Sequence, residues 1–346
     1  MPKSLIKNGY RIVIWAVLLS FFSVTNLLAK GEGVKKLVFE RFVNFDTKKA
    51  KSLTLKDDYL YVSNGSGGIV VIDVSNKTYP KKLLKFDTSD KVYEVKIDGN
   101  YAYAANGGGG LLIIDVSDKT RFEKIAKTSV AKKAVDVDYK NGYVYIADKG
   151  DSLITIDARD KIYPRKISSV KISVSKIEVS GDYLYAGTDK GMVVFDIKEE
   201  GNPKLIGEYK NFKKTKDIFI KGDYAYLAEG EYGIEVLDIS DKRRPKKAAF
   251  YKPDGKIVSL FCEDGYLYAA DSEGEIKIFR AEGDYIEPVS SFETEGKAKK
   301  IFVKDKTVYI AEGKKGVEIG TLSEKNRFSF DFSGFSFLFF ISYLMF

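Results

Sequence analysis

Short apolar runs alternate with turn residues along most of the chain. The segment 91–130 is representative and reads KVYEVKI, DGN, YAYAA, NGGGG, LLIIDVS, DKTR and FEKIAKTSV. Four apolar runs of strand length, separated by glycine, asparagine and aspartate, predict four strands joined by tight connections. Between residues 47 and 325 no window has a sustained helical period. The pattern therefore predicts an all-β fold.

A Tyr-x-Tyr motif repeats with this four-strand pattern at a nearly constant period. Its second position recurs seven times, at intervals of 42, 42, 40, 41, 42 and 41 residues. The seven residues are Tyr61, Tyr103, Tyr145, Tyr185, Tyr226, Tyr268 and Tyr309. Seven such units are typical of a β-propeller. We predict a seven-bladed β-propeller of four-stranded antiparallel blades over residues 30–333, with units starting near residues 49, 91, 133, 173, 214, 256 and 297.

An aspartate ends the predicted third strand in five of the units. These residues are Asp73, Asp115, Asp157, Asp196 and Asp238. Each carboxylate is expected to accept backbone N–H bonds and so to start the next turn.

The residues around these aspartates resemble the LVIVD repeat. They read GGIVVIDVS at 67–75, GGLLIIDVS at 109–117 and YGIEVLDIS at 232–240. The resemblance extends from residue 47 to about residue 330. It implies a propeller of bacterial or archaeal type, often exported or attached to the cell surface. The family has no shared catalytic set, so the resemblance assigns no catalytic residue.

Both chain ends offer a strand that could close the ring. Residues 35–46, KKLVFERFVNFD, are similar to the last strand of a unit such as KKLLKFDT at 81–88. We predict that 35–46 is the outer strand of the seventh blade. The alternative is 328–340, where phenylalanine first alternates with serine and aspartate. The apolar aromatic tail at 334–346 is either a covered edge or disordered end, or a contact with a membrane or partner.

The first residues have the pattern of an export signal. Residues 1–11 contain Lys3, Lys7 and Arg11 and no acid, and residues 12–29 contain no charge. We predict that 1–29 is a signal peptide or an uncleaved N-terminal membrane anchor. Either case places the remainder outside the cytoplasm, in the periplasm, outside the cell or at its surface.

Composition excludes several kinds of chemistry. The 346 residues contain no histidine and one cysteine, Cys262, which we expect in the core. Histidine-based triads, imidazole metal sites and an internal disulfide are therefore excluded. The net charge of +8 falls to +5 without residues 1–29, because these carry three positive charges and no negative one. So mild an excess does not indicate a nucleic-acid partner, and we expect no cofactor and no metal.

Superposing the seven units shows two recurrent polar positions. The first lies twelve residues before the second tyrosine and is lysine in six units, with Ser173 in the fourth. These lysines, here called the outer lysine ring, are Lys49, Lys91, Lys133, Lys214, Lys256 and Lys297. The second position lies three residues after the tyrosine. Its residues, here called the amide–carboxylate ring, are Asn64, Asn106, Asp148, Thr188, Glu229, Asp271 and Glu312.

Both rings are expected at the mouth of the propeller's central channel. Converging ammonium groups favour an anion, so we predict an anionic ligand such as an acidic sugar or a carboxylate. The lysines could also be one duplicated surface residue, or the two rings could only neutralise each other. A cation on Asp148, Asp189, Glu229, Asp271 and Glu312 is less favoured, because one carboxylate per blade is too dispersed for calcium.

Three functions are therefore compared. The first is a non-enzymatic scaffold that binds a protein or an anionic glycan through one propeller face. The alternative is a glycosidase or lyase that uses carboxylates, although no spacing identifies a carboxylate pair. The third is a purely structural surface protein.

Overall fold

The computed structural model describes residues 35–149 and 152–326, and its regular elements there are all β-strands. They form seven four-stranded antiparallel sheets, as predicted. In blades 1 to 3 the strands are β2 Ser52–Lys56, β3 Tyr59–Ser63, β4 Ile69–Asp73, β5 Lys81–Phe86, β6 Glu94–Asp98, β7 Tyr101–Ala105, β8 Leu111–Asp115, β9 Glu123–Thr128, β10 Ala134–Lys140, β11 Tyr143–Asp148, β12 Ser152–Asp157 and β13 Arg165–Lys171.

The remaining blades repeat this order. Their strands are β14 Val174–Ser180, β15 Tyr183–Thr188, β16 Gly191–Asp196, β17 Lys204–Lys210, β18 Asp217–Lys221, β19 Tyr224–Ala228, β20 Ile234–Asp238, β21 Lys246–Tyr251, β22 Ile257–Glu263, β23 Tyr266–Asp271, β24 Glu275–Glu282, β25 Tyr285–Glu293, β26 Lys300–Lys304, β27 Thr307–Ala311, β28 Val317–Asn326 and β1 Lys35–Phe45. Residues Leu37–Ser323 form one compact unit, the propeller. The other unit comprises residues 1–36 and 324–346, of which 35–36 and 324–326 are described.

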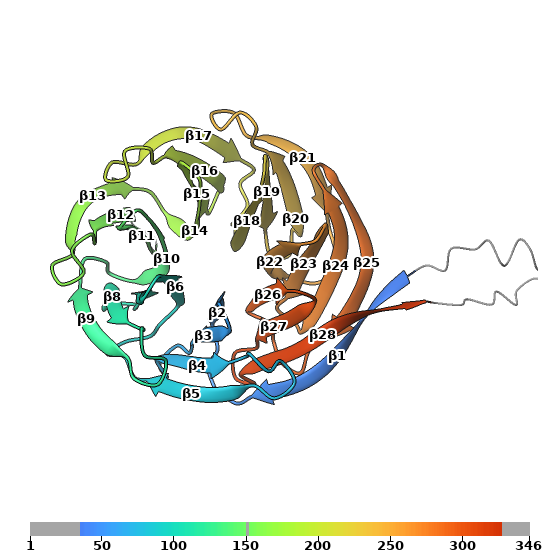
Figure 1. Ribbon diagram of the computed structural model, residues 1–346. Helices are drawn as coiled ribbons and strands as arrows, with labels where there is room; N and C mark the ends of the chain where they lie inside the picture. The colour runs from blue at the N-terminus through green and yellow to red at the C-terminus, as the bar shows by residue number, and fades with distance from the viewer. Residues whose placement is uncertain (1–34, 150–151, 327–346) are drawn as a thin grey trace, which may run out of the picture. The chain divides into compact units, whose positions relative to one another are not determined.

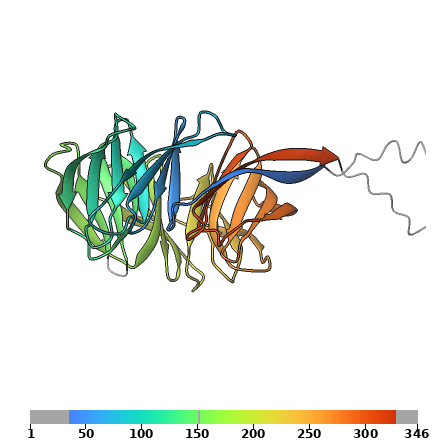
Figure 2. The same cartoon turned by 90° about the horizontal axis from the view of Figure 1, so that it is seen from below.

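The seven sheets surround a common axis (Figure 1). The inner strands contact one another in the order β2, β6, β10, β14, β18, β22, β26 and back to β2. Figure 2 shows the strands running between two opposite faces of the propeller. Because neighbouring strands in a blade are antiparallel, the inner strand starts on the face where the second strand turns into the third. We call this the lysine face, after Lys49 and its equivalents, and the opposite one the loop face.

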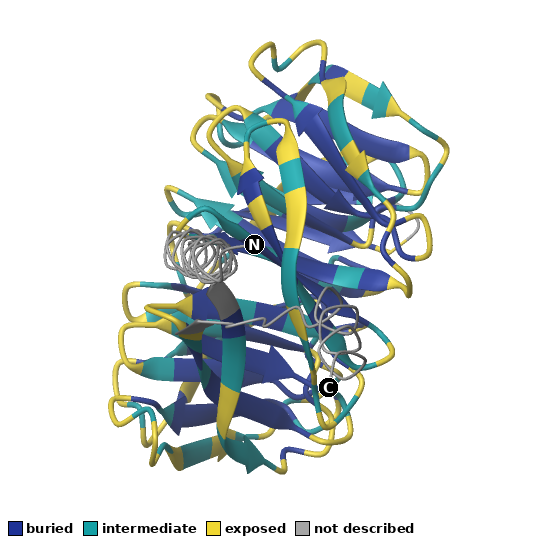
Figure 3. Cartoon of the chain, turned by 90° about the vertical axis from the view of Figure 1, so that its right-hand side faces the viewer, coloured by how far each residue is buried: buried dark blue, intermediate teal, exposed yellow. Residues whose placement is uncertain are grey.

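Apolar packing between blades holds the ring together. Tyr61 of blade 1 is buried in one cluster with Val95 and Ala102 of blade 2, and the other blade pairs repeat the arrangement. Figure 3 shows buried positions along the strands, and exposed ones in the loops and on parts of some strands. Each blade thus covers the sheet face of its neighbour, as strands that are apolar on both faces require. Cys262 lies buried on β22, which confirms the prediction made for it.

The N-terminal strand completes the seventh blade. The strand order there is β1-β28-β27-β26, so β1 is outermost, in the place that sequence similarity assigned to residues 35–46. Leu37 is buried in the cluster between blades 6 and 7, and Val43 and Phe45 pack against the cluster between blades 7 and 1. A bond from the Ala50 amide to the Gly313 carbonyl, 3.0 Å, also joins blade 1 to blade 7.

Three sequence predictions lie outside the described residues. They are the signal or anchor at 1–29, the alternative closing strand at 328–340 and the apolar tail at 334–346. Within residues 35–149 and 152–326 there is no helix with the length and apolar character needed to cross a bilayer.

The aspartates that end the third strands act as predicted. Asp73 accepts the backbone N–H of Ser75 at 2.9 Å, and Asp115 accepts that of Ser117 at 2.8 Å. Hydrogen bonds from the following serine lower the pKa of both carboxyl groups. The equivalent aspartates of blades 3, 4 and 5 make the same bond. This turn chemistry starts the loops of the loop face.

Candidate functional site

The outer lysine ring lies on the lysine face, where each lysine immediately precedes an inner strand. All but Lys214 are exposed, and Lys214 is half-buried. Lys214 is paired with Asp189, and the Lys297 ammonium lies 3.1 Å from Glu273. Lys133 lies over the ring of Tyr93, 5.6 Å from its centroid. The structure therefore gathers these six side chains on one face, and their proposed role in anion binding stays a prediction.

The amide–carboxylate ring is buried beneath that face, and its oxygens accept backbone N–H groups. Asn64 accepts the Lys49 amide at 3.1 Å, Asp148 that of Lys133 at 2.7 Å, and Asp271 that of Lys256 at 3.2 Å. Glu312 accepts the Gly296 amide at 3.3 Å. The other members are also buried: Asn106, Thr188 and Glu229. The amide–carboxylate ring thus contacts the outer lysine ring through the backbone N–H groups of its lysines.

Three further lysines join the outer ring on the lysine face, two residues further along their blades. They are Lys51, Lys216 and Lys299, here called the inner lysines. Partial burial and the nearby positive charge of Lys214 lower the pKa of Lys216. Partial burial and the nearby positive charges of Lys51 and Lys297 lower the pKa of Lys299. Sequence comparison missed these residues because only three blades carry them.

The centre of the ring, which looks open between the ribbons in Figure 1, contains a largely buried polar cluster. Seven equivalent positions form it, nine residues before each second tyrosine: Ser52, Glu94, Asp136, Lys176, Asp217, Ser259 and Lys300. The Lys176 ammonium lies 3.1 Å from both Glu94 and Asp136 and 4.0 Å from Asp217. Lys300 lies 2.9 Å from Asp217. We call these seven residues the axial cluster.

A second layer lies two residues further along each inner strand. On one side Lys96 lies 3.5 Å from Asp138 and 3.6 Å from Glu178. On the other side Phe261 lies between Phe219 and Phe302, with ring centroids 5.1 and 4.5 Å away. Ionic and aromatic side chains therefore occupy the axis at this level. The same superposition that reveals the two lysine-face rings also identifies both layers.

The structure also brings together two carboxylate pairs that spacing did not identify. Glu229 and Glu235 share Asn211 as a partner, and Lys247 lies 2.9 Å from Glu235. Burial and the adjacent Glu235 raise the pKa of Glu229 to about 7. The pair in blade 7 is Glu312 and Glu318, and Arg41 of β1 binds Glu318.

Burial and Glu318 raise the pKa of Glu312 to about 8. All four carboxyl groups are buried. The described residues contain no group of three or more acidic or cysteine side chains arranged to hold a metal ion.

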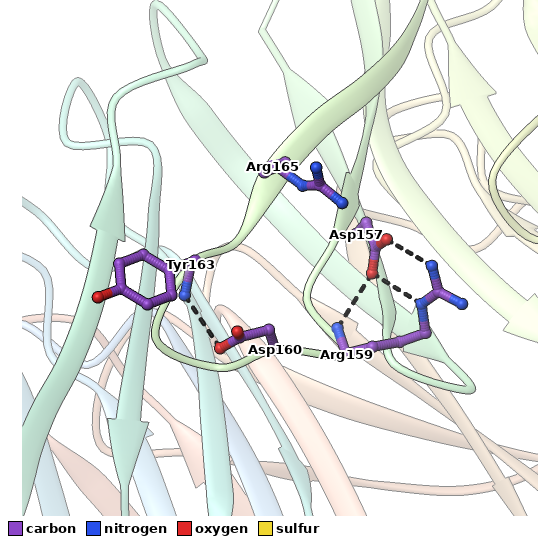
Figure 4. A pocket seen from close by; sticks show the side chains of 5 residues that line it. All are labelled: Asp157, Arg159, Asp160, Tyr163 and Arg165. Atoms are coloured by element: carbon purple, nitrogen blue, oxygen red, sulfur yellow. Dashed lines mark hydrogen bonds and ion pairs between the residues drawn. The ribbon is translucent and has the colours of Figure 1, made fainter.

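Open concavities occur on the loop face, in the loops between third and fourth strands. The cavity of blade 3 has a volume of about 440 Å³ (Figure 4). Its lining residues are Asp157, Arg159, Asp160, Tyr163 and Arg165. Equivalent loops form cavities of about 260 Å³ in blade 1 and about 150 Å³ in blade 4.

Family comparison identifies the repeat. Five segments match the model of the LVIVD repeat: residues 47–88, 90–124, 131–171, 173–211 and 213–251. Together they cover more than half of the chain. A comparison with curated proteins yields no match.

Solved structures with similar folds share little sequence with this chain. U3-55K aligns with a TM-score of 0.66 at 10% identity, over 83% of this chain and 98% of that one. A chain of the mitotic checkpoint complex aligns with a TM-score of 0.64 at 10% identity, over 83% and 90%. The computationally designed Ika8 protein aligns with a TM-score of 0.59 at 10% identity, over 82% and 99%. Likeness at this identity supports the propeller fold alone.

Proposed function

The chain belongs to the LVIVD repeat family, and we propose that it is a non-enzymatic binding scaffold whose lysine face binds an anionic partner. That partner is an anionic glycan or an acidic protein surface. The scaffold works outside the cytoplasm, in the periplasm or at the cell surface, as residues 1–29 indicate. The N-terminal segment, if uncleaved, and the apolar tail would add membrane contact.

The concentration of lysine on one face is the observation that carries this proposal. Six outer-ring lysines and three inner lysines share it. The pKa values of Lys216 and Lys299 are lowered because both side chains are partly buried and because neighbouring ammonium groups repel their positive charge. An anion bound between them would relieve this repulsion, so the free energy of binding gains from the crowding.

The acidic groups beneath this face cancel only part of that charge. The raised pKa values of Glu229 and Glu312 leave a large share of both protonated near neutral pH. Exposed acids such as Asp189 and Glu273 each offset a single outer-ring lysine. The face is therefore positive overall.

Burial of the carboxylate pairs favours binding over hydrolysis. A glycosidase needs two carboxyl groups that flank the bond to be broken and touch the substrate. Glu229 and Glu235 are only 2% and 1% exposed, and Glu312 and Glu318 only 1% and 0%. Their contacts with Asn211, Lys247 and Arg41 give them a stabilising role instead.

The proposal is tested by replacing Lys51, Lys216 and Lys299 together with glutamine, which keeps much of the side-chain stem and removes the charge. Affinity of the full chain is measured for a uronic-acid polysaccharide, a sulfated polysaccharide, polyglutamate and neutral dextran. We expect wild-type binding to the polyanions only, weakening as salt rises. The variant should bind at least about tenfold more weakly, because three charge contacts are lost.

A matched control removes three lysines elsewhere. Lys82, Lys124 and Lys166 are exposed on the outer strands β5, β9 and β13. Their triple glutamine variant has the same net charge and should bind like wild type. Equal weakening in both variants would assign binding to overall charge, and no wild-type binding to any polyanion would reject the proposal.

A further inference from the structure

Three of the residues that line the loop-face cavity of blade 3, Asp157, Arg159 and Asp160, are held in place by hydrogen bonds. The Arg159 guanidinium forms a two-pronged contact with Asp157, at 2.9 and 2.7 Å. It also lies over the ring of Tyr143, 5.0 Å from the centroid. Asp160 accepts the backbone N–H of Ile162 at 2.9 Å and of Tyr163 at 3.2 Å. A ligand therefore loses little free energy in ordering these three residues.

The charges of the cavity balance. Arg159 and Arg165 contribute two positive charges, and Asp157 and Asp160 two negative ones. The hydrogen bond from Arg159 lowers the pKa of Asp157 to about 2, so this carboxylate stays ionised near neutral pH. A strongly charged ligand gains little in such a site, whereas a neutral ligand with several hydroxyl groups finds both donors and acceptors.

An exposed aromatic ring borders these polar groups. Tyr163 is 73% exposed, and Figure 4 shows Asp160 between Tyr163 and the Asp157–Arg159 pair, with the Tyr163 ring extending outward from the loop. The neighbouring Pro164 restricts the backbone next to it. A flat apolar surface beside convergent polar groups suits a ligand with one apolar face and polar edges. A sugar ring has that shape and chemistry.

We propose that the blade 3 cavity binds one neutral sugar ring, stacked on Tyr163 and hydrogen-bonded by Arg165 and Asp160. The site lies on the face opposite the lysine face and does not depend on it. Its volume of about 440 Å³ falls within the usual range of about 300–1,000 Å³ for small-molecule sites.

Blades 1 and 4 provide an internal comparison. In blade 1 the cavity of about 260 Å³ is lined by Asp73, Ser75, Asn76, Tyr79 and Lys81, and Tyr79 is 75% exposed. In blade 4 Asn202 stands in place of the tyrosine, and the cavity is about 150 Å³. The blade 1 cavity is therefore a weaker second site for the same ligand, and the blade 4 cavity lacks the stacking surface.

The test uses the full chain and four neutral probes: the methyl glycosides of glucose, galactose, mannose and N-acetylglucosamine. Saturation-transfer NMR and calorimetry measure binding. We expect wild-type binding of at least one probe, with saturation strongest on the ring protons that face Tyr163. Tyr163→Ala should weaken binding at least about tenfold, because the stacking surface is lost, whereas Tyr163→Phe should retain it.

Two controls separate this site from others. Tyr285, 51% exposed in blade 6, tests whether any exposed tyrosine suffices, and Tyr285→Ala should bind like wild type. The lysine-face triple variant should also bind these probes normally, so the two proposals fail independently. No wild-type binding to any probe, or unchanged binding by Tyr163→Ala, would overturn the proposal.

Discussion

Lys176 shows how single charged residues determine what fills the propeller axis. It is 9% exposed and lies within 4.0 Å of carboxylates from three other blades. Burying a charge costs several kcal/mol unless partners compensate, and here Glu94, Asp136 and Asp217 supply them. Burial raises the pKa of Asp136 to about 6 although Lys176 opposes the shift. The stability of the axial cluster therefore depends on pH as well as on how its side chains pack.

The raised carboxyl pKa values predict that stability falls as pH rises from about 5 to about 8. Glu229 and Glu312 have pKa values of about 7 and about 8 in the folded chain, against about 4.3 for an unfolded glutamate. Between these values the folded state holds protons that the unfolded state releases. Stability is therefore greatest below the unfolded pKa and is lost as pH passes the folded one.

Thermal unfolding of the variant Glu229→Gln/Glu312→Gln measures this contribution. Because neutral glutamine replaces the protonated acids, the decline in Tm between pH 5 and 8.5 should be smaller than in wild type. Part of the decline should remain, since Asp136 contributes in the same direction. Glu293→Gln, at an exposed position of β25, serves as the control and should leave the profile unchanged. Parallel profiles for the double variant and wild type would contradict the assignment.

At the scale of elements, the turn between second and third strands is the most constrained. Gly110 there has φ +70°, and a Cβ atom would lie 2.0 Å from the Thr128 carbonyl oxygen of the fourth strand. Gly68 and Gly316 occupy the same place in blades 1 and 7, where the distances are 2.0 and 1.8 Å. The outer strand thus packs directly on glycine backbone, and the NGGGG sequence serves the turn.

Gly110→Ala should therefore destabilise the fold more than a positive φ alone would. Gly99→Ala is the matched control, because Gly99 has φ +53° and a Cβ added there would meet no atom within 4 Å. We expect the control to lower the free energy of unfolding by about 1–2 kcal/mol. Gly110→Ala should lower it by about 1–3 kcal/mol more, because the fourth strand must move. Urea unfolding measures both, and equal losses would show that the close approach is unimportant.

At the scale of the whole molecule, closure of the ring joins residues from opposite ends of the sequence. β1 is the outermost strand beside β28, and its Arg41 binds the buried Glu318. Without β1 the β28 edge would be open, and an unpaired edge invites aggregation. Closure also covers the apolar side chains between blades 7 and 1. The strand therefore serves both pairing and packing.

Deleting residues 35–46 should lower Tm by about 10 °C or more. The deletion removes the packing of the buried Leu37 and of the half-buried Val43 and Phe45. Full burial of such a side chain contributes about 1.5–3 kcal/mol, and each kcal/mol shifts Tm by about 2–4 °C in domains of about 150–250 residues. Differential scanning calorimetry measures the change. A Gly-Ser linker of equal length in place of 35–46 should behave like the deletion, and an unchanged Tm in either chain would contradict closure by β1.

The sequence by itself determined the blade number, the strand order within each blade and the turn aspartates. These follow from local period and turn chemistry, which each unit of about 42 residues carries in full. Superposing the units also located the two rings of the lysine face. Conversely, spacing could not show that Asp148 bonds the main chain of Lys133, because both side chains could equally have faced solvent.

Only the tertiary structure decided which side chains meet across blades. Lys176 reaches Glu94 over 82 positions of sequence, and Arg41 reaches Glu318 over 277. The pairing of Glu312 with Glu318 and the cavity beside Tyr163 likewise arise from packing in three dimensions. The physical reason is that period and turn chemistry act within one blade, whereas burial and charge act through space, once the ring has closed.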